Sequence, residues 1–228
     1  MSLRKELHPK IISFDLDGTL IDKNFDDLLW LEEFPKIYAR QKSVPIADAK
    51  KLFYAEYAKY GSNRMEWYDV DYWFRRFGLR ALPSDVVNEM RSHIKIYPDT
   101  IPALKALSNR GCRMIVFSNS ARIFLDAKIK VEGLGEYFEQ VISLPTDWKM
   151  IKGYDGAFAR LSKEMKVKPS DILHVGDSFE QDYLSAKREG CKAVLLVRPD
   201  GEKNNRKTSK ALKIASLMEL TKIYDERK

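Results

Sequence analysis

The sequence predicts an α/β protein in which a Rossmann-like parallel sheet, with helices on both faces, is joined to a small all-helical domain. Short apolar, β-branched segments alternate along most of the 228 residues with amphipathic segments of helical period. Such alternation is typical of a parallel sheet covered by helices. The stretch from about residue 22 to residue 98 differs, because it lacks strand-like segments and holds 15 of the 26 aromatic residues.

Five segments are expected to be buried strands, since each is a short and mainly apolar run. They are residues 10–14, 113–117, 140–144, 172–175 and 193–197. Amphipathic helices are expected at residues 101–109, 121–131, 155–165 and 180–189. Gly111 and Gly190 follow two of these helices, where a residue of left-handed conformation commonly ends a helix.

Apolar residues recur at helical intervals in four parts of the stretch between residues 22 and 98. These parts begin near Phe25, Leu52, Trp67 and Asp85. Pro35, in the first of them, must begin or kink a turn. We therefore expect a discontinuous core domain, residues 1–21 and 99–228, and a helical cap domain, residues 22–98. Most aromatic side chains of the cap are expected to pack inside it.

Composition excludes several classes of protein. Apolar residues make up 44% and charged residues 32% of the chain, a balance typical of a globular protein. No segment has the roughly 18 uninterrupted apolar residues of a membrane span, and the first ten residues lack the apolar stretch of a secretory signal. These features predict a cytoplasmic protein without a membrane partner.

Cysteine usage and charge disfavour two further kinds of site, a catalytic thiol and a nucleic-acid surface. Cys112 and Cys191 do not form a CxxC motif or a disulfide framework, and both are expected to be small buried residues at strand starts. Residues 198–213 contribute +4 of the net charge of +7. No aromatic residue lies among these charges to stack on a base, so we expect a solvated surface loop and no nucleic-acid partner.

Two carboxylates come directly after the first predicted strand. The side chains of Asp15 and Asp17 point the same way, because side chains in a strand alternate with a period of two. Gly18 then allows the chain to turn sharply. Such a pair suits a nucleophile or metal ligand beside an acid–base group, although Asp-Gly is also a common turn dipeptide.

Further polar residues follow the second strand and precede a predicted helix. Ser118 and Asn119, at the end of the second strand, predict either an anion-binding corner or an ordinary helix N-cap. Lys152 precedes the helix expected at residues 155–165, and Lys149 is a nearby competitor.

The strand at residues 172–175 is followed by Asp177 and, one helical turn later, by Asp182. These carboxylates can join those after the first strand only if the two strands are parallel neighbours. Ligand sites of open α/β sheets do lie beyond the carboxyl ends of the strands. His174 is part of the strand, so we expect a buried, hydrogen-bonded histidine and not a catalytic one.

Taken together, these motifs resemble those of the haloacid dehalogenase-like hydrolases. The sequence reads FDLDGTL at residues 14–20, VFSNS at 116–120, KGYDGAF at 152–158 and HVGDSFEQD at 174–182. Their order is that of the family, and the resemblance covers nearly all of residues 10–220. The family's lysine often stands in a KPxPxxF segment. Both prolines are missing here, which leaves Lys149 as an alternative to Lys152. The helical insertion matches the position of the family's cap.

The resemblance implies phosphoryl transfer through an aspartyl-phosphate, a form of covalent catalysis. Asp15 is expected to attack phosphorus, while Asp17 protonates the leaving oxygen and later deprotonates the hydrolytic water. Mg²⁺ is the expected cofactor, because the implied ligands are all oxygen donors. These ligands are the carboxylates of Asp15 and Asp177 and the main-chain carbonyl of Asp17.

The remaining implied residues hold the phosphate or support the groups that do. The phosphate-binding residues are expected to be Thr19, Ser118, Asn119 and Lys152. Asp182 and Ser178 are expected behind them, where Asp182 orients Lys152 or a metal-bound water.

The implied function is a phosphatase, similar to phosphoglycolate phosphatases, that acts on a small phosphorylated metabolite. A dehalogenase needs no proton donor for its halide, so Asp17 favours the phosphatase, while a sugar phosphomutase shares the carboxylate pair and stays an alternative. A non-catalytic binding protein on this scaffold is expected to lack one of the Asp or Lys residues, and all are present. Arg64 and Arg75 of the cap are candidates to face the substrate, whose identity the sequence leaves open, as it does the oligomeric state.

Overall fold

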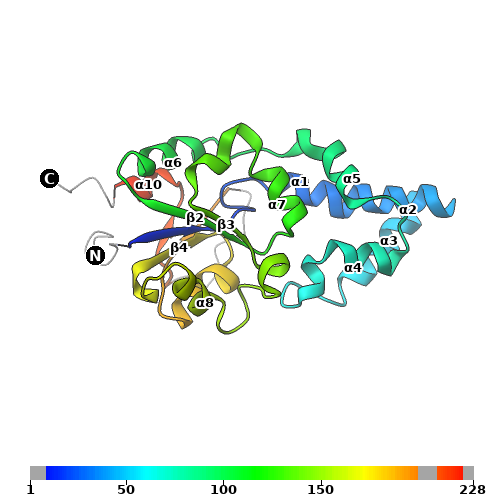
Figure 1. The fold of residues 1–228 in the computed structure, drawn as a ribbon. Coiled ribbons are helices and arrows are strands. Elements are labelled where there is room, and N and C mark those ends of the chain that lie inside the picture. The colour runs from blue at the N-terminus through cyan, green and yellow to red at the C-terminus, as the bar shows by residue number, and fades with distance from the viewer. Residues whose placement is uncertain (1–8, 200–209, 223–228) are drawn as a thin grey trace.

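Six parallel strands form one sheet, in the order β3-β2-β1-β4-β5-β6 (Figure 1). The structure, a computed structural model, describes residues 9–199 and 210–222. The strands are β1 (Ile11–Phe14), β2 (Arg113–Ser118), β3 (Gln140–Ser143), β4 (Ile172–Gly176), β5 (Lys192–Leu196) and β6 (Lys213–Ile214). The predicted parallel α/β sheet is confirmed, and β6 is an additional short strand at its edge.

Helices cover both faces of the sheet, because the strands direct apolar side chains to both faces. Ile12 and Phe14 of β1 belong to the core beneath α6 (Thr100–Ser108), α7 (Arg122–Lys128) and α10 (Met218–Thr221). Ile11 belongs to the opposite core, beneath α8 (Ala157–Glu164) and α9 (Ser185–Arg188). Figure 1 shows α6 and α10 on one side of the sheet and α8 on the other.

A group of helices lies beyond one end of the sheet, on the right of Figure 1. It consists of α1 (Asn24–Leu28), η1 (Leu29–Glu33), α2 (Phe34–Lys42), α3 (Ile46–Tyr57), η2 (Met65–Tyr68), α4 (Val70–Phe77), α5 (Pro83–Met90) and η3 (Arg91–His93). Pro35 does not interrupt the helical run formed by α1, η1 and α2. It lies in the first turn of α2, directly after the π-helical turn η1. A π-turn can accommodate an interruption of the hydrogen-bond ladder within a helix.

Aromatic rings fill the interior of this helical cap. The rings of Phe53 and Phe77 stack with their centroids 3.6 Å apart, and Tyr57 meets Trp73 edge-on at 4.7 Å. Phe53 and Trp73 are almost completely buried. A pair of packed rings stabilises the folded state by about 0.5–1.5 kcal/mol beyond the effect of its buried area. These ring contacts therefore stabilise the packing of the cap, and the rings lie inside it as the sequence predicts.

The two connections between the cap and the sheet run side by side. The Asp22 N–H donates to the Lys95 carbonyl at 2.9 Å, and the Tyr97 N–H donates to the Leu20 carbonyl at 3.1 Å. The Thr100 hydroxyl donates to the same Leu20 carbonyl at 2.9 Å. The chain therefore leaves for the cap and returns from it at one place, a few residues beyond the end of β1.

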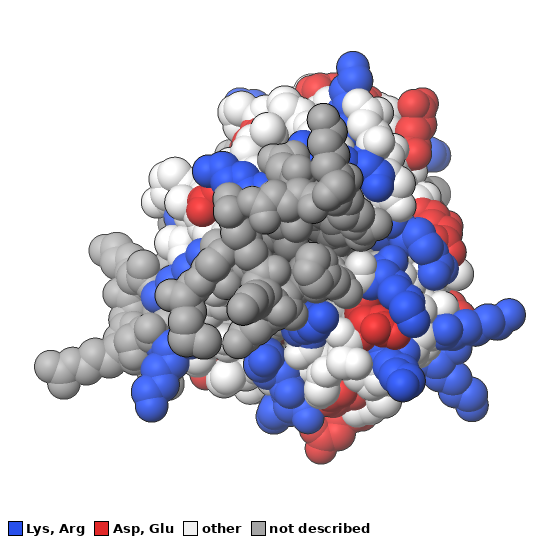
Figure 2. Space-filling model, turned by 90° about the vertical axis from the view of Figure 1, so that its left-hand side faces the viewer, with Lys and Arg blue, Asp and Glu red and all other residues white. Residues whose placement is uncertain are grey.

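Arg198 corrects the prediction of a solvated loop at residues 198–213. Its side chain is buried, donates to Asp99 Oδ1 at 2.8 Å and to the Thr19 carbonyl at 2.6 Å, and lies over the Tyr97 ring. Residues 200–209 lie outside the described residues, whereas Lys210 is exposed. Figure 2, which views the end of the molecule opposite the cap, shows basic side chains interspersed with acidic ones.

The two cysteines differ in burial. Cys191 is buried directly before β5, as expected, but Cys112 before β2 is only partly buried. Among the described helices, none is both long and apolar enough to cross a membrane.

We expect Arg198→Ala to lower the free energy of unfolding by about 2–4 kcal/mol. The substitution removes the charged partner of the Asp99 carboxylate, which keeps only the donors Ser216 and Leu217 among the described residues, and it removes the side-chain donor to the Thr19 carbonyl. Urea denaturation followed by circular dichroism measures the loss. The matched control is Lys210→Ala, an exposed change that we expect to cost less than about 0.5 kcal/mol. Equal effects of the two substitutions would show that Arg198 has no such structural role.

Candidate active site

The polar motifs meet at one edge of the sheet because β1 lies between the two strands that precede the other motifs. Phe14 of β1 is in register with Val116 of β2 and with Val175 of β4. The Asp15 N–H continues this pairing and donates to the Val175 carbonyl at 2.9 Å. The carboxyl ends of β1, β2 and β4 are therefore adjacent, where open α/β sheets bind ligands.

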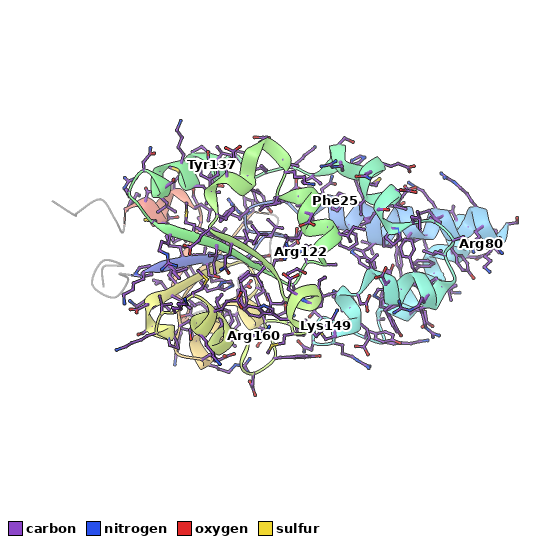
Figure 3. The ribbon with its side chains drawn as sticks, viewed as in Figure 1. Phe25, Arg80, Arg122, Tyr137, Lys149 and Arg160 are labelled. Atoms are coloured by element: carbon purple, nitrogen blue, oxygen red, sulfur yellow. The ribbon has the colours of Figure 1, made fainter. Side chains whose placement is uncertain are left out.

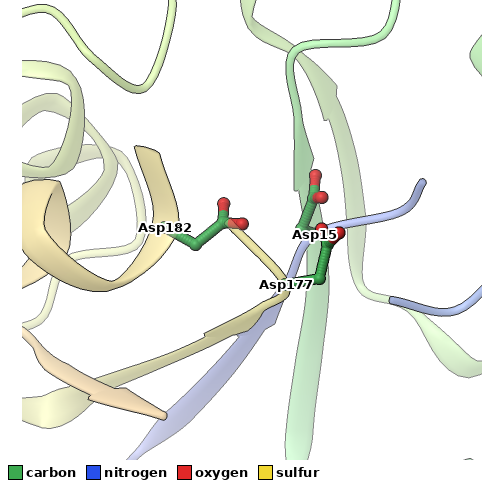
Figure 4. A group of neighbouring side chains, drawn as sticks. All are labelled: Asp15, Asp177 and Asp182. Carbon is green, nitrogen blue, oxygen red and sulfur yellow. The ribbon is translucent and has the colours of Figure 1, made fainter. Parts of the chain in front are cut away.

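Three buried carboxylates gather at this edge. In the described part of the chain, Asp15, Asp177 and Asp182 each place an oxygen within 4.8 Å of the others. Figure 4 shows Asp15 and Asp177 at the ends of neighbouring strands, with the Asp182 carboxylate directed toward them from the following helical segment. Of the expected metal ligands, Asp15 and Asp177 are thus together. The Asp17 carboxylate lies elsewhere, which leaves open the expected role of its main-chain carbonyl.

Lys152 is the cation of this cluster. Its buried ammonium lies 2.7 Å from Asp15 Oδ1 and also donates to Asp182 Oδ1. Burial alone would lower the pKa of Lys152, but the two carboxylates raise it above its ordinary value. Lys149, the alternative from sequence, is exposed at the end of η5 (Leu144–Trp148) and is labelled in Figure 3. The structure therefore places Lys152, and not Lys149, with the aspartates.

Asp182 is held from several sides. Besides Lys152, it is bonded to His174 Nε2 at 3.1 Å and accepts the Ser178 N–H at 2.9 Å. Burial alone would raise the pKa of Asp182, but the charges and hydrogen bonds of Lys152 and His174 hold it below its ordinary value. His174 itself is buried and bonded through Nδ1 to the Ser13 hydroxyl. It is therefore the buried, hydrogen-bonded residue expected from sequence.

Two glycines allow the carboxylates to approach the backbone. A Cβ on Gly18, whose φ is +78°, would lie 2.4 Å from Asp177 Oδ2, and a Cβ on Gly176 would lie 2.3 Å from the Asp182 carboxylate. Both distances are below any van der Waals contact. The glycines of the DGT and GD motifs are therefore required by close packing as well as by chain direction.

The cluster has an excess of negative charge. Three carboxylates face two ammonium groups, Lys152 and Lys23, and Lys23 Nζ lies 2.7 Å from Asp177 Oδ2. Burial raises the pKa of Asp177 to about 7 and also raises the pKa of Asp15, in both cases against the attraction of a lysine. An all-oxygen donor set with uncompensated charge fits a hard divalent cation.

The phosphate-binding residues expected after β2 are linked to the cap through Gln181. Asn119 donates to Gln181 Oε1 and accepts the Lys152 N–H at 2.9 Å. The Tyr68 hydroxyl donates to the same Gln181 oxygen at 3.0 Å, and Gln181 Nε2 donates to the Ser62 carbonyl at 2.8 Å. Gln181 was not predicted, although it lies within the HVGDSFEQD motif, because a motif does not show what the cap brings to it.

Ser118 and Ser178 lie close to where they were expected, and Thr19 does not. The Ser118 hydroxyl accepts the Ser120 N–H at 3.0 Å and faces the cavity described below. Ser178 begins the helical segment η7 (Phe179–Leu184) and accepts the Gln181 N–H. The Thr19 hydroxyl is buried, has no hydrogen-bond partner among the described residues and does not line the cavity. The structure therefore does not bring Thr19 together with the other residues that were expected to bind phosphate.

Lys128 is a second buried lysine, which sequence reasoning missed. Its ammonium donates to Asp17 Oδ1 at 2.6 Å and to Asp26 Oδ2 of α1 at 2.7 Å, and its side chain is completely buried. It also lies over the ring of Phe25, labelled in Figure 3. Burial alone would lower the pKa of Lys128, but the two carboxylates raise it. No motif identified this residue, because its two partners, Asp17 and Asp26, are 111 and 102 residues away in the sequence.

Asp17 is set apart from the other aspartates by this contact. Burial raises its pKa to about 6, the Asp26 carboxylate adds to the increase, and Lys128 opposes it. A carboxyl group with such a pKa can donate and accept protons near neutral pH. The pair of carboxylates after β1 thus has two environments, with Asp15 beside Lys152 and Asp17 beside Lys128.

A cavity of about 380 Å³ lies between this edge of the sheet and the cap. Its floor includes Asp15, Asp17, Lys152 and Asp177, and its opposite wall includes Trp30, Trp67 and Tyr68 of the cap. Arg64 and Arg75 do not line it, which corrects that expectation. Arg64 pairs instead with Glu66 and lies over the Tyr60 ring.

The chain belongs to the haloacid dehalogenase-like hydrolases, whose family model matches residues 9–190. The fold and the four assembled motifs agree with this finding, and the resemblance seen in the sequence is confirmed. Members of this family generally use a divalent metal, which agrees with the buried aspartate cluster.

Several phosphatases are among the relatives of the chain, which spans about three-fifths of the length of YrfG, one of the curated proteins that it matches. A solved phosphatase of this family from Thermococcus onnurineus matches with a TM-score of 0.81 and 27% identity, over 93% of this chain and 96% of that one. Phosphoglycolate phosphatase 1 of Pseudomonas aeruginosa is 25% identical over 83% of this chain and 70% of its own length. The GMP/IMP nucleotidase YrfG of Escherichia coli is 28% identical over 135 residues, which are 59% of this chain and 60% of YrfG.

We expect the metal-free protein to lose stability as the pH rises from about 5 to about 8. Asp17 and Asp177 have pKa values of about 6 and about 7 in the folded protein, above their ordinary value, so the folded chain binds more protons than the unfolded chain. The stability that these protons confer is lost as the pH passes through the two values. Melting temperatures in the presence of a chelator measure the effect.

The control for this pH dependence is a pair of variants. Asp177→Asn removes one of the titrating groups and should flatten the slope of melting temperature against pH. Asp126→Asn changes an exposed carboxylate on α7 and should leave the slope as it is. A melting temperature that rises from pH 5 to pH 8 would contradict the assignment of raised pKa values.

Proposed function

We propose that the protein is a Mg²⁺-dependent phosphatase that hydrolyses a phosphate monoester of a small metabolite through an aspartyl-phosphate. The observation that carries the proposal is the Asp15 carboxylate, which lies on the cavity floor 2.7 Å from the Lys152 ammonium and beside Asp177. Phosphatases among the relatives support the reaction class. Residues 22–98 serve in this proposal as a cap over the site.

The reaction begins with attack by an Asp15 carboxylate oxygen on phosphorus. The bond from phosphorus to the ester oxygen breaks, and Asp17 gives its proton to that oxygen. Lys152, Ser118 and the Asn119 amide hold the other phosphate oxygens, where negative charge is concentrated. Asp15 and Asp177, with the main-chain carbonyl of Asp17, would hold Mg²⁺, which when bound offsets the repulsion between carboxylate and phosphate.

A water molecule then completes the reaction. Asp17, now ionised, takes a proton from this water as the water attacks phosphorus. The bond between phosphorus and Asp15 breaks, and phosphate leaves. A pKa of about 6 suits Asp17 to both transfers, because the group changes its protonation state near neutral pH at little cost.

We expect Asp15→Asn to lower the rate of phosphate release from p-nitrophenyl phosphate by at least about 1,000-fold, since an amide of nearly the same shape is a poor nucleophile. Excess chelator should stop the wild-type reaction, and added Mg²⁺ should restore it. The matched control is Asp126→Asn, which changes an exposed carboxylate and should leave turnover unchanged. Wild-type turnover by Asp15→Asn would show that no phosphoenzyme forms on this residue.

A substitution of Lys128 tests whether this residue supports proton transfer by Asp17 or only the structure of the site. Because it holds the Asp17 carboxylate at 2.6 Å, we expect Lys128→Met to impair the protonation of the leaving oxygen. The value of kcat/KM should fall about 100-fold for an alkyl phosphate, which needs a proton, and by less than about 10-fold for p-nitrophenyl phosphate, which does not. Lys130→Met, an exposed change two residues away, is the control. Equal losses on both substrates would assign Lys128 a purely structural role.

A further inference from the structure

The cavity between the sheet and the cap has two chemically different ends. The end at the sheet holds the aspartates, Lys152 and the small polar residues that follow β2. The end at the cap is built largely from large apolar side chains, which are Trp30, Leu31, Tyr57, Trp67, Tyr68 and Trp73. A phosphate at the sheet end would therefore place the remainder of the substrate against aromatic rings.

Two of these side chains expose apolar surface that the cap core does not use. Trp67 is 37% exposed and Leu31 is 38% exposed, although both are large and apolar. Covering such apolar surface with an apolar ligand is favourable in water. Both residues line the cavity, so part of their apolar surface is available to a ligand there.

The rings of the aromatic wall pack against one another and against neighbouring rings. Trp30 meets Phe34, Tyr57 and Phe124 edge-on at centroid distances of 5.0, 5.8 and 5.9 Å. Trp67 in turn meets Tyr57 at 6.3 Å. Since these contacts restrict the rings, little side-chain entropy remains to be lost when the ring of a ligand stacks on them.

The cap end offers no positive charge for an acidic substrate. Among the described residues that line the cavity, the basic ones are Lys23 and Lys152, and both are paired with the aspartates of the sheet end. The cap instead contributes Asp26 and Asp27 to the lining. Asp26 is already paired with Lys128, so a carboxylate or second phosphate on the substrate would find no unpaired cation among these described lining residues, whereas sugar hydroxyls or ring N–H groups would find acceptors.

We infer that the substrate is a phosphate monoester whose leaving group carries a flat, uncharged ring system, of the kind found in a nucleoside monophosphate. This inference rests on the proposed phosphatase function and names its substrate class. The ring lies among Trp30, Trp67 and Tyr68, while the phosphate reaches Asp15. A volume of about 380 Å³ lies within the usual range of pockets for such ligands.

The first test compares substrates in the Mg²⁺-loaded wild-type protein. We expect kcat/KM for GMP to exceed that for 2-phosphoglycolate by at least about 10-fold, with glycerol 1-phosphate also poor, because only the ring covers the aromatic wall. Hydrolysis of 2-phosphoglycolate at least as efficient as that of GMP would overturn the inference and leave the phosphatase function intact.

The second test removes one ring from the wall. Trp67→Ala should raise KM for GMP at least about 5-fold, as expected for the loss of one stacking partner. It should change kcat/KM for glycerol 1-phosphate by less than about 2-fold, because that substrate has no ring to stack. The matched control is Leu82→Ala, which removes an equally apolar side chain that is 62% exposed and lies outside the cavity. An equal loss on both substrates in Trp67→Ala would overturn the inference.

The third test does not depend on hydrolysis. GMP should bind to Asp15→Asn protein with quenching of tryptophan fluorescence and with higher affinity than 2-phosphoglycolate, as measured by calorimetry, and inorganic phosphate should cause no quenching. If GMP binds in this way but the wild-type protein hydrolyses no ester, the proposed phosphatase function is wrong and the inferred binding site for a ring is supported. If GMP neither quenches the fluorescence nor binds more tightly than 2-phosphoglycolate, the inferred binding site for a ring is wrong.

Discussion

The site depends on the burial of three carboxylates beside one buried lysine. Asp15, Asp177 and Asp182 would repel one another strongly in a medium of low dielectric constant. Lys152 bridges Asp15 and Asp182, and its own backbone is fixed by Asn119. The surrounding geometry follows from this need for compensation. Gly176 lets Asp182 approach the strand, and the charge that remains is what makes the cluster suited to a divalent cation.

The cap contributes to the same electrostatic balance, so its position and the chemistry of the site are coupled. Lys23 pairs with Asp177, Asp26 shares Lys128 with Asp17, and the cap residues Ser62 and Tyr68 hold Gln181 against Asn119. Each of these links joins a cap residue, directly or through one side chain, to a group at the sheet edge. A cap that opened would leave two aspartates without a cation, which favours the closed arrangement when the site is formed.

Much of the core could be predicted from sequence, because its signals are local. The strands are apolar runs, and the aspartates, Ser118, Asn119 and Lys152 stand at fixed places after strands or before a helix. The residues that were missed or misplaced depend on long-range contacts. Lys128 and Arg198 look like ordinary surface charges until Asp26 and Asp99 are brought to them. Thr19 shares a motif with Asp17 but does not line the cavity. The two-residue strand β6 is too short to have a periodic signal.

The two ends of the cavity differ in how freely evolution can change them. At the sheet end, a side chain on Gly18 or Gly176 would collide with a carboxylate, and loss of Lys152 would leave buried charge unpaired. At the cap end, Leu31 and Trp67 are more than one-third exposed, so their replacement removes less packing than the replacement of a fully buried side chain. Substitutions there alter the surface offered to the leaving group. In the proposed function, the residues that carry out the reaction are therefore more constrained by packing than those that contact the leaving group.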